Sequence, residues 1–241
     1  PKDIKLETGR HYPPYWQGFQ IDAQFTFAKL LKNLGPNEIK IDLTPDTDRD
    51  ATRICFALSD HPGIFSRLSG ALALVGANVV DARSYTSKDG FATAAFWVQD
   101  SDGAPYDRPR FSRLRAMIEK TLSGEIITRE AIKERDKFKK RERAFKVPTS
   151  ISFNNEGSEI YTIIEVDTRD RPGLLFDLTR TLANMNVYIA SAIIATYGEQ
   201  VVDNFYVKDM FGLKFHSESK QKKLEQNLRQ AITLGVERAQ S

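Results

Sequence analysis

Two short segments carry residue types that can bind a small charged molecule. The segments 60–65 and 170–175 both read Asp-x-Pro-Gly followed by apolar residues. An Asp followed by Pro and Gly predicts a tight turn into a helix, and the free N–H groups at a helix start attract an anion. The Asp carboxylate can accept hydrogen bonds from an ammonium group. Each segment can therefore bind a zwitterion such as a free amino acid; the alternative is that each Asp only caps its helix.

The candidate ligand residues come from these two loops, together with two residues at later strand starts, which the family resemblance given below implies would face the ligand. Gly63 and Gly173 have no Cβ, which lets a ligand approach the backbone closely. His61 and Arg171 are either specificity residues or exposed loop side chains. The predicted set is Asp60, His61, Pro62, Gly63, Ile64, Phe65, Asn78, Asp170, Arg171, Pro172, Gly173, Leu174, Leu175 and Tyr188.

The two segments belong to an internal repeat with a shift of 110 positions. The shift places Leu68 on Leu178, and it still holds far downstream, where Leu114 falls on Leu224. We therefore expect two copies of one fold, which occupy residues 39–123 and 149–234. The copies differ at some candidate positions, such as Asn78 against Tyr188, so their two sites can differ in function.

Each copy predicts a strand, a helix, two further strands and a second helix. Runs of β-branched and aromatic residues indicate the strands, and apolar residues at helical spacing indicate the helices. The expected strands are 53–58, 77–86 and 91–99 in the first copy, and 160–166, 187–196 and 201–208 in the second.

A fourth strand is expected from the segment that precedes each first strand. These segments are Glu38–Leu43 and Thr149–Phe153, and they give the order ββαββα. The alternative is that Thr149–Phe153 closes the first copy. The predicted class is α+β, with two ferredoxin-like sandwiches and an N-terminal arm and helix.

The repeat divides the chain into four parts. We expect an arm and helix at 1–38, the first copy at 39–124, a charged linker at 125–148 and the second copy at 149–241. The aromatic-proline run His11–Trp16 is expected to be a packed, extended arm, and a binding motif is the alternative. The run Arg129–Lys146 has nine Lys or Arg against four Asp or Glu, which is typical of a solvated helix; a contact with nucleic acid or a protein is the alternative.

Composition excludes several classes of protein. The 241 residues are 41% hydrophobic and 28% charged, an ordinary globular balance. No apolar run is long enough to span a bilayer, and Pro1 at the start suggests a piece of a longer protein. The single cysteine excludes a disulfide framework and fits a reducing cytosol, so we expect a cytoplasmic location and no membrane partner. The net charge of +3 does not support binding to nucleic acid.

The Asp-x-Pro-Gly turn between a strand and an amphipathic helix resembles the ACT domain. Two such copies preceded by His11–Trp16 resemble the C-terminal region of the bacterial PII uridylyltransferase/uridylyl-removing enzyme family, with further matches at Thr86–Gly90 and Val147–Thr149. The resemblance implies two ACT folds and an amino-acid effector, glutamine, at the strand-to-helix loops. It also implies that ACT sheets associate side by side, within one chain or between chains.

The same resemblance implies a parent enzyme that transfers UMP from UTP to a tyrosine of the PII signalling protein and removes it again, with Mg as cofactor. The catalytic domains would precede this region. Asp46 with Asp48, and Asp100 with Asp102, have the spacing of metal-binding carboxylates but lack the Gly-Ser neighbour that nucleotidyl transfer needs. With three histidines and no His-Asp pair, a hydrolase metal cluster is also not expected. We therefore expect no catalysis, cofactor or metal in this chain itself.

Two rival functions stay open at this point. One is a stand-alone amino-acid sensor built from ACT repeats. The other is an RNA-binding module, because the same element order serves RNA-binding domains and Lys88–Phe96 faintly resembles their base-stacking strand.

Overall fold

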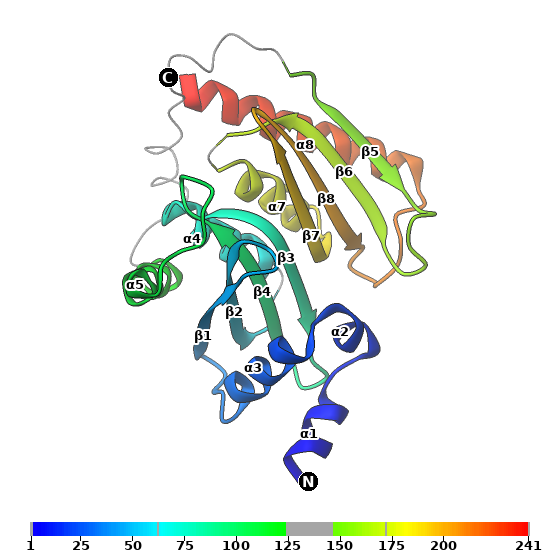
Figure 1. Cartoon of the computed structure of the whole chain (residues 1–241). Coiled ribbons are helices and arrows are strands. Elements are labelled where there is room, and N and C mark those ends of the chain that lie inside the picture. Colours follow the sequence, from blue (N-terminus) through cyan, green and yellow to red (C-terminus); the bar gives the residue numbers. More distant parts are fainter. Residues whose placement is uncertain (1, 62, 124–146, 172, 241) are drawn as a thin grey trace.

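The computed structural model describes residues 2–61, 63–123, 147–171 and 173–240 (Figure 1). The strands are β1 (Ile39–Asp46), β2 (Ala51–Ser59), β3 (Asn78–Thr86), β4 (Phe91–Gln99), β5 (Ser150–Asn154), β6 (Thr162–Arg169), β7 (Tyr188–Tyr197) and β8 (Gln200–Lys208). The helices are α1 (Lys2–Arg10), α2 (Pro13–Gly18), α3 (Ile21–Leu31), α4 (Ile64–Leu74), η1 (Arg108–Arg110), α5 (Phe111–Leu122), α7 (Leu174–Asn184) and α8 (Glu218–Gln240).

All eight strands form one antiparallel sheet in the order β1-β2-β4-β3-β7-β8-β6-β5. The predicted α+β class is confirmed, and each half takes its edge strand from the segment before its first strand. The alternative origin of the fourth strand is wrong, because β5 pairs with β6 at the sheet edge opposite to β1.

The repeat appears in the structure as a near-twofold relation between the halves. The strands β3 and β7 pair through Ala82 and Ala192, two residues that the 110-position shift makes equivalent. Each strand also has a register shift at the same place, between residues 79 and 81 in β3 and between 189 and 191 in β7.

The ungapped shift of 110 fails in one place. Phe96 of β4 pairs with Ile54 and Ala82, whereas Phe205 of β8 pairs with Ile164 and Ala192. The strands β4 and β8 therefore correspond at a shift of 109. The reason is a hairpin turn before β8 that is one residue shorter than the turn before β4.

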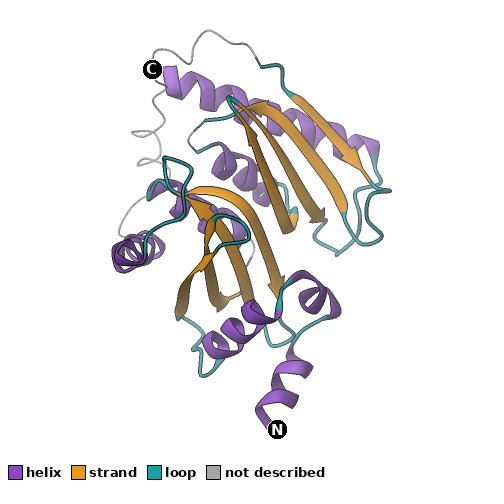
Figure 2. Ribbon diagram, viewed as in Figure 1, coloured by secondary structure: helices purple, strands orange, loops and turns teal. Residues whose placement is uncertain are grey.

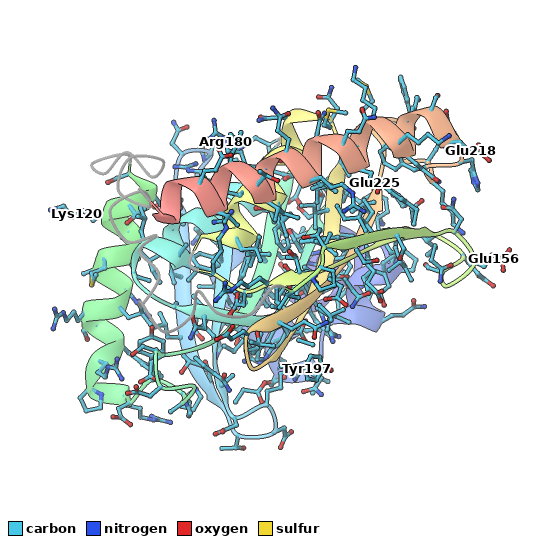
Figure 3. The ribbon with its side chains drawn as sticks, turned by 90° about the horizontal axis from the view of Figure 1, so that it is seen from above. Lys120, Glu156, Arg180, Tyr197, Glu218 and Glu225 are labelled. Atoms are coloured by element: carbon cyan, nitrogen blue, oxygen red, sulfur yellow. The ribbon has the colours of Figure 1, made fainter. Side chains whose placement is uncertain are left out.

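One face of the sheet is covered by helices along its whole width (Figure 2). Helix α4 packs against α7 at the centre, with α5 beside α4 and α8 beside α7. Figure 3 shows α8 lying across α7, with Glu225 on α8 and Arg180 on α7 labelled. A single hydrophobic core lies beneath these helices and includes residues of both halves.

Among the described residues, helices cover the opposite face in the first half and not in the second. In the first half, α3 packs on β1 and β2 and α2 packs on β3, and a second apolar cluster forms beneath them (Figure 1). Strand β2 can be buried on both faces because Cys55 and Ala57 point toward α3. The equivalent residues of β6 are Glu165 and Asp167, and β6 alternates between buried and more exposed positions. At these positions the outer face of the second half is therefore polar, whereas that of the first half is apolar.

Two local predictions are wrong. Pro13–Gly18 is helical rather than extended, because proline is well tolerated in the first turn of a helix. Strand β6 begins at Thr162 instead of residue 160, since the Ser158 hydroxyl accepts hydrogen bonds from the N–H groups of residues 160 and 161 and holds them in a turn.

The predicted linker helix Arg129–Lys146 lies outside the described residues. Within the described part of the chain, no helix has the length and apolar character that a bilayer crossing requires.

A buried carboxylic acid distinguishes the second half from the first. Asp203 of β8 is 1% exposed, and its Oδ1 has no hydrogen-bond partner among the described residues. Its counterpart at the shift of 109 is Ala94 of β4. Burial, with a smaller effect of the nearby Asp170 carboxylate, raises the pKa of Asp203 well above its usual range.

We predict that Asp203 makes the fold less stable as the pH rises. Above about pH 4 the unfolded chain has released this proton while the folded chain still holds it, so the free energy of unfolding falls with rising pH. The thermal midpoint of Asp203→Asn should exceed that of the wild type at pH 7.5, and the difference should shrink toward pH 4. Glu165→Gln, which alters an exposed residue of β6, is the control and should change neither the thermal midpoint at pH 7.5 nor its dependence on pH. Parallel pH profiles for wild type and Asp203→Asn would contradict the prediction.

Candidate ligand-binding site

A cleft opens where the two halves of the sheet join. The strands β3 and β7 pair at only three positions, 81 with 193, 82 with 192 and 83 with 191. Beyond these pairs, the end of β3 and the start of β7 no longer bond to each other. The space between them leads to a cleft of about 700 Å³, which residues 84–86 and 187–190 line together with the loop 60–66.

A chain of hydroxyl groups crosses this opening from one half to the other. The Thr86 hydroxyl donates to the Asp60 carboxylate at 2.6 Å, and it lies 3.0 Å from the Tyr188 hydroxyl. The Asp60 N–H also donates to the Gly90 carbonyl at 2.9 Å, which fixes the loop against the β3–β4 hairpin. Burial raises the pKa of Tyr188 to about 12, so this hydroxyl keeps its proton at neutral pH. The site thus places a half-buried carboxylate beside two hydroxyl groups.

The start of α4 forms another wall of the cleft. Gly63 precedes the helix with a left-handed backbone, φ +82°, and no side chain caps the helix. The alternative that Asp60 serves only as a cap is therefore wrong, because its carboxylate bonds to Thr86 instead. The Ile64 N–H donates to the His61 carbonyl at 3.2 Å, and the N–H groups that follow it in the first turn of α4 can receive an anionic group.

Of the other candidates in the first loop, one is exposed at the rim of the cleft and two are buried in the hydrophobic core. His61 is exposed, with its Nε2 3.5 Å from Nη1 of Arg67. Ile64 and Phe65 line the cleft but are 4% exposed, and the Phe65 ring packs on Phe96 with centroids 5.1 Å apart. Their first role is therefore in the core. Pro62 lies outside the described residues.

The second loop has the same backbone but different side-chain contacts. Gly173 precedes α7 with φ +75°, as Gly63 precedes α4. Arg171 is buried and pairs with Asp177 of α7 at 2.5 Å, whereas its counterpart His61 is exposed. Asp170 is exposed and its N–H donates to the Glu199 carbonyl.

The remaining candidates lie apart from the cleft that the first loop forms. Leu174 is buried and Leu175 is partly buried against the common core. Asn78 is exposed, and its side-chain amide donates to the Asp100 carbonyl. Pro172 lies outside the described residues. Of the predicted set, the structure brings together Asp60, His61, Gly63, Ile64, Phe65 and Tyr188 in one cleft.

Several lining residues were not predicted from the sequence. Tyr12 and Tyr15 come from the N-terminal segment, and Tyr161 and Lys208 come from the second half. The Lys208 ammonium lies 5.1 Å from the centroid of the Tyr161 ring, a cation–π contact. Thr86 could have been found from the repeat, because it aligns with Thr196.

The carboxylate pairs Asp46–Asp48 and Asp100–Asp102 lie at turns, where Asp46 and Asp100 accept hydrogen bonds from nearby protein groups. Asp46 accepts a hydrogen bond from the Trp97 indole at 2.6 Å, and Asp100 accepts from the backbone of residues 102 and 104 and from Arg110. The described residues contain no group of His, Cys, Asp or Glu that could hold a metal ion. The outer face of β4, where the RNA-binding alternative needs an exposed aromatic residue, packs against the apolar cluster beneath α2 and α3, which Phe91 contacts.

Comparison with known proteins agrees with the architecture. Residues 150–237 match a family model described as an ACR9-like, ACT-like domain. Because the first half repeats the fold of the second, the structure is a pair of ACT-like domains joined in one sheet. An aspartate kinase from Synechocystis aligns with 75% of this chain and 27% of its own at 14% identity, with a TM-score of 0.38, which is too low to establish a shared fold.

Curated relatives match nearly the whole chain. It is 68% identical to the bifunctional uridylyltransferase/uridylyl-removing enzyme of Ruegeria pomeroyi over 98% of this chain and 26% of that protein. The enzyme of the same name from Cereibacter sphaeroides is also 68% identical, over 99% of this chain and 26% of the relative, and that of Azospirillum brasilense is 41% identical over 95% and 25%. The predicted resemblance to these enzymes is confirmed, and the chain spans about a quarter of their length.

The left-handed backbone at Gly63 gives a direct test of the loop. Gly63→Ala should lower the free energy of unfolding by about 1–2 kcal/mol, because an L side chain is strained at positive φ. Its new Cβ would lie 3.7 Å from the Ala183 side chain, so the strain comes from the backbone. Gly9→Ala is the control, since its Cβ meets nothing within 4 Å, and chemical denaturation should show no loss there. Equal stability of Gly63→Ala and wild type would refute this backbone assignment.

Proposed function

We propose that this chain is the amino-acid-sensing part of a bifunctional enzyme that uridylylates and deuridylylates the PII signalling protein, and that it binds glutamine. The observation that carries the proposal is the cleft at the joint of the two halves. It places the Asp60 carboxylate next to the start of α4, where no side chain caps the helix. One loop therefore offers a hydrogen-bond acceptor, the carboxylate, and hydrogen-bond donors, the backbone N–H groups of the helix. The similarity to the uridylyltransferase/uridylyl-removing enzymes supports the wider assignment.

The geometry suggests how a zwitterion would lie in the cleft. Its carboxylate would accept hydrogen bonds from the first N–H groups of α4, where Gly63 leaves the backbone open. Its ammonium would donate to Asp60, whose carboxylate already accepts from Thr86. The glutamine side chain would extend toward the Tyr188 hydroxyl, which belongs to the other half. A bound ligand would thus touch both ACT-like domains.

A ligand that touches both halves can shift the arrangement of the pair. β3 and β7 pair at only three positions, so a ligand that contacts both halves beside this joint can favour one arrangement of the pair. A ligand that binds one arrangement more tightly would favour it and pass that preference to attached catalytic domains. Those domains would carry the chemistry and the Mg, in the cytoplasm.

Within the chain, the two ACT-like sheets associate side by side through the β3–β7 contact. Self-association between chains stays part of the proposal, because β1 and β5 each have a strand partner on one side only.

Calorimetric titration of this chain with L-glutamine tests the proposal. Asp60→Asn should weaken binding at least about tenfold, because it removes a charged hydrogen-bond acceptor for the ammonium. Asp170→Asn is the matched control, since it makes the same change at the equivalent position of the other copy, outside this cleft. It should bind as the wild type does.

The outcomes separate the parts of the proposal. A folded wild-type chain that gives neither heat nor a thermal shift with glutamine would contradict glutamine binding here. Binding of a different amino acid in a panel would keep the sensing role and change the effector. Equal losses in both Asp variants would move the site away from the first loop or divide it between the two.

A further inference from the structure

The N-terminal segment forms part of the cleft wall, although it precedes both ACT-like domains. Tyr12, Pro14 and Tyr15 line the cleft together with the loop at Asp60. Figure 1 shows α2 close to the end of β3, next to the opening between the two halves. A ligand in the cleft would therefore meet this segment as well as the two domains.

Tyr15 has the features of a ligand-directed group. It is 2% exposed, and among the described residues no hydrogen bond involves its hydroxyl. The hydroxyl is not among the fully buried polar atoms that lack a partner, and the Tyr15 side chain borders a cleft large enough to hold a ligand that accepts its hydrogen bond. Burial raises the pKa of Tyr15, so the hydroxyl stays protonated and can donate.

The ring of Tyr15 is held in place by an aromatic cluster. It stacks on His11 with centroids 3.6 Å apart and planes 5° from parallel. Trp16 contacts both rings edge-on, at 5.0 Å from Tyr15 and 5.7 Å from His11. The edge of Phe19 closes the cluster at 5.3 Å. A shift of the Tyr15 ring would therefore change the packing around the Trp16 ring.

An ion pair connects α1 to the β3–β4 hairpin, which contacts the loop of the site. Arg10, at the end of α1, pairs with Glu7 at 2.8 Å and with Asp89 at 3.1 Å. Asp89 lies in the β3–β4 hairpin, whose Gly90 carbonyl accepts the N–H of Asp60. The cleft is thus joined to α1 by two routes, one through the stacked rings and one through the hairpin.

We propose that Tyr15 is a ligand-positioning residue of this cleft, donating its hydroxyl to the bound amino acid, and that the cluster of His11, Tyr15 and Trp16 transmits occupancy of the cleft to helix α1. The proposal rests on the proposed function, since it assumes an amino acid in the cleft. It adds that the segment before the first ACT-like domain is part of the receptor rather than a passive connection.

Tyr15→Phe tests the hydroxyl while it keeps the ring and its stacking. Titration with L-glutamine should show about a five- to tenfold weaker affinity, the size of one lost hydrogen bond, with little change in thermal midpoint. Tyr106→Phe is the control, because Tyr106 is also buried but does not line the cleft. Its affinity should equal that of the wild type.

A spectroscopic readout tests the first step of this transmission, from Tyr15 to Trp16 within the cluster that follows α1. The chain has two tryptophans, Trp16 in the cluster and Trp97 in the sheet, so fluorotryptophan labelling gives two ¹⁹F NMR signals that Trp97→Phe assigns. Glutamine should shift the Trp16 signal and leave Trp97 nearly unchanged. If Trp97→Phe does not fold, Trp16→Phe gives the same assignment.

The outcomes distinguish this inference from the proposed function. If the wild type binds glutamine and Tyr15→Phe binds it with the same affinity, the role of the hydroxyl is overturned. If glutamine does not shift the ¹⁹F signal of Trp16, the transmission is overturned. Both results leave glutamine sensing intact. Absence of glutamine binding by the wild type would overturn the proposed function and, with it, this extension.

Discussion

The structure depends on a short contact between two strands. The strands β3 and β7 meet side by side through three residue pairs, with Ala82 opposite Ala192 at the centre. This contact is enough to merge two four-stranded sheets into one and to place α4 against α7 over a common core. Because the two strands are longer than their contact, they separate beyond it. The separation creates the cleft, so the interface that unites the halves also produces the candidate site.

The two halves share a backbone plan but have diverged in their surroundings. The first half is covered on its second face by α2 and α3, which fit over the small residues Cys55 and Ala57. The equivalent positions of β6 in the second half are Glu165 and Asp167, which are polar. The asymmetry between the halves therefore follows from which residues point away from the common core.

A similar divergence affects the turns after the last strands. The turns at 100–104 and 209–213 have the same hydrogen bonds, in which an Asp carboxylate accepts two backbone N–H groups. In the first copy the turn carries Ser101 and Asp102, whereas the second carries Met210 and Phe211, which are 66% and 73% exposed. Met210 borders the cleft. The second turn therefore adds apolar surface at the rim without any change in its fold.

The amino-acid sequence alone predicts the repeat, the order of the elements, the ACT resemblance and the loop at Asp60, because apolar periodicity and Asp-x-Pro-Gly turns are local signals. It could not determine that Tyr188 faces Asp60, that Tyr15 joins the same cleft, or that Arg171 turns into a buried pair with Asp177. Those facts depend on the β3–β7 contact and on how α2, α3 and α8 cover the sheet. Only tertiary packing decides which of two nearly equivalent loops opens onto a cleft, since the residues that line it are far apart in the chain.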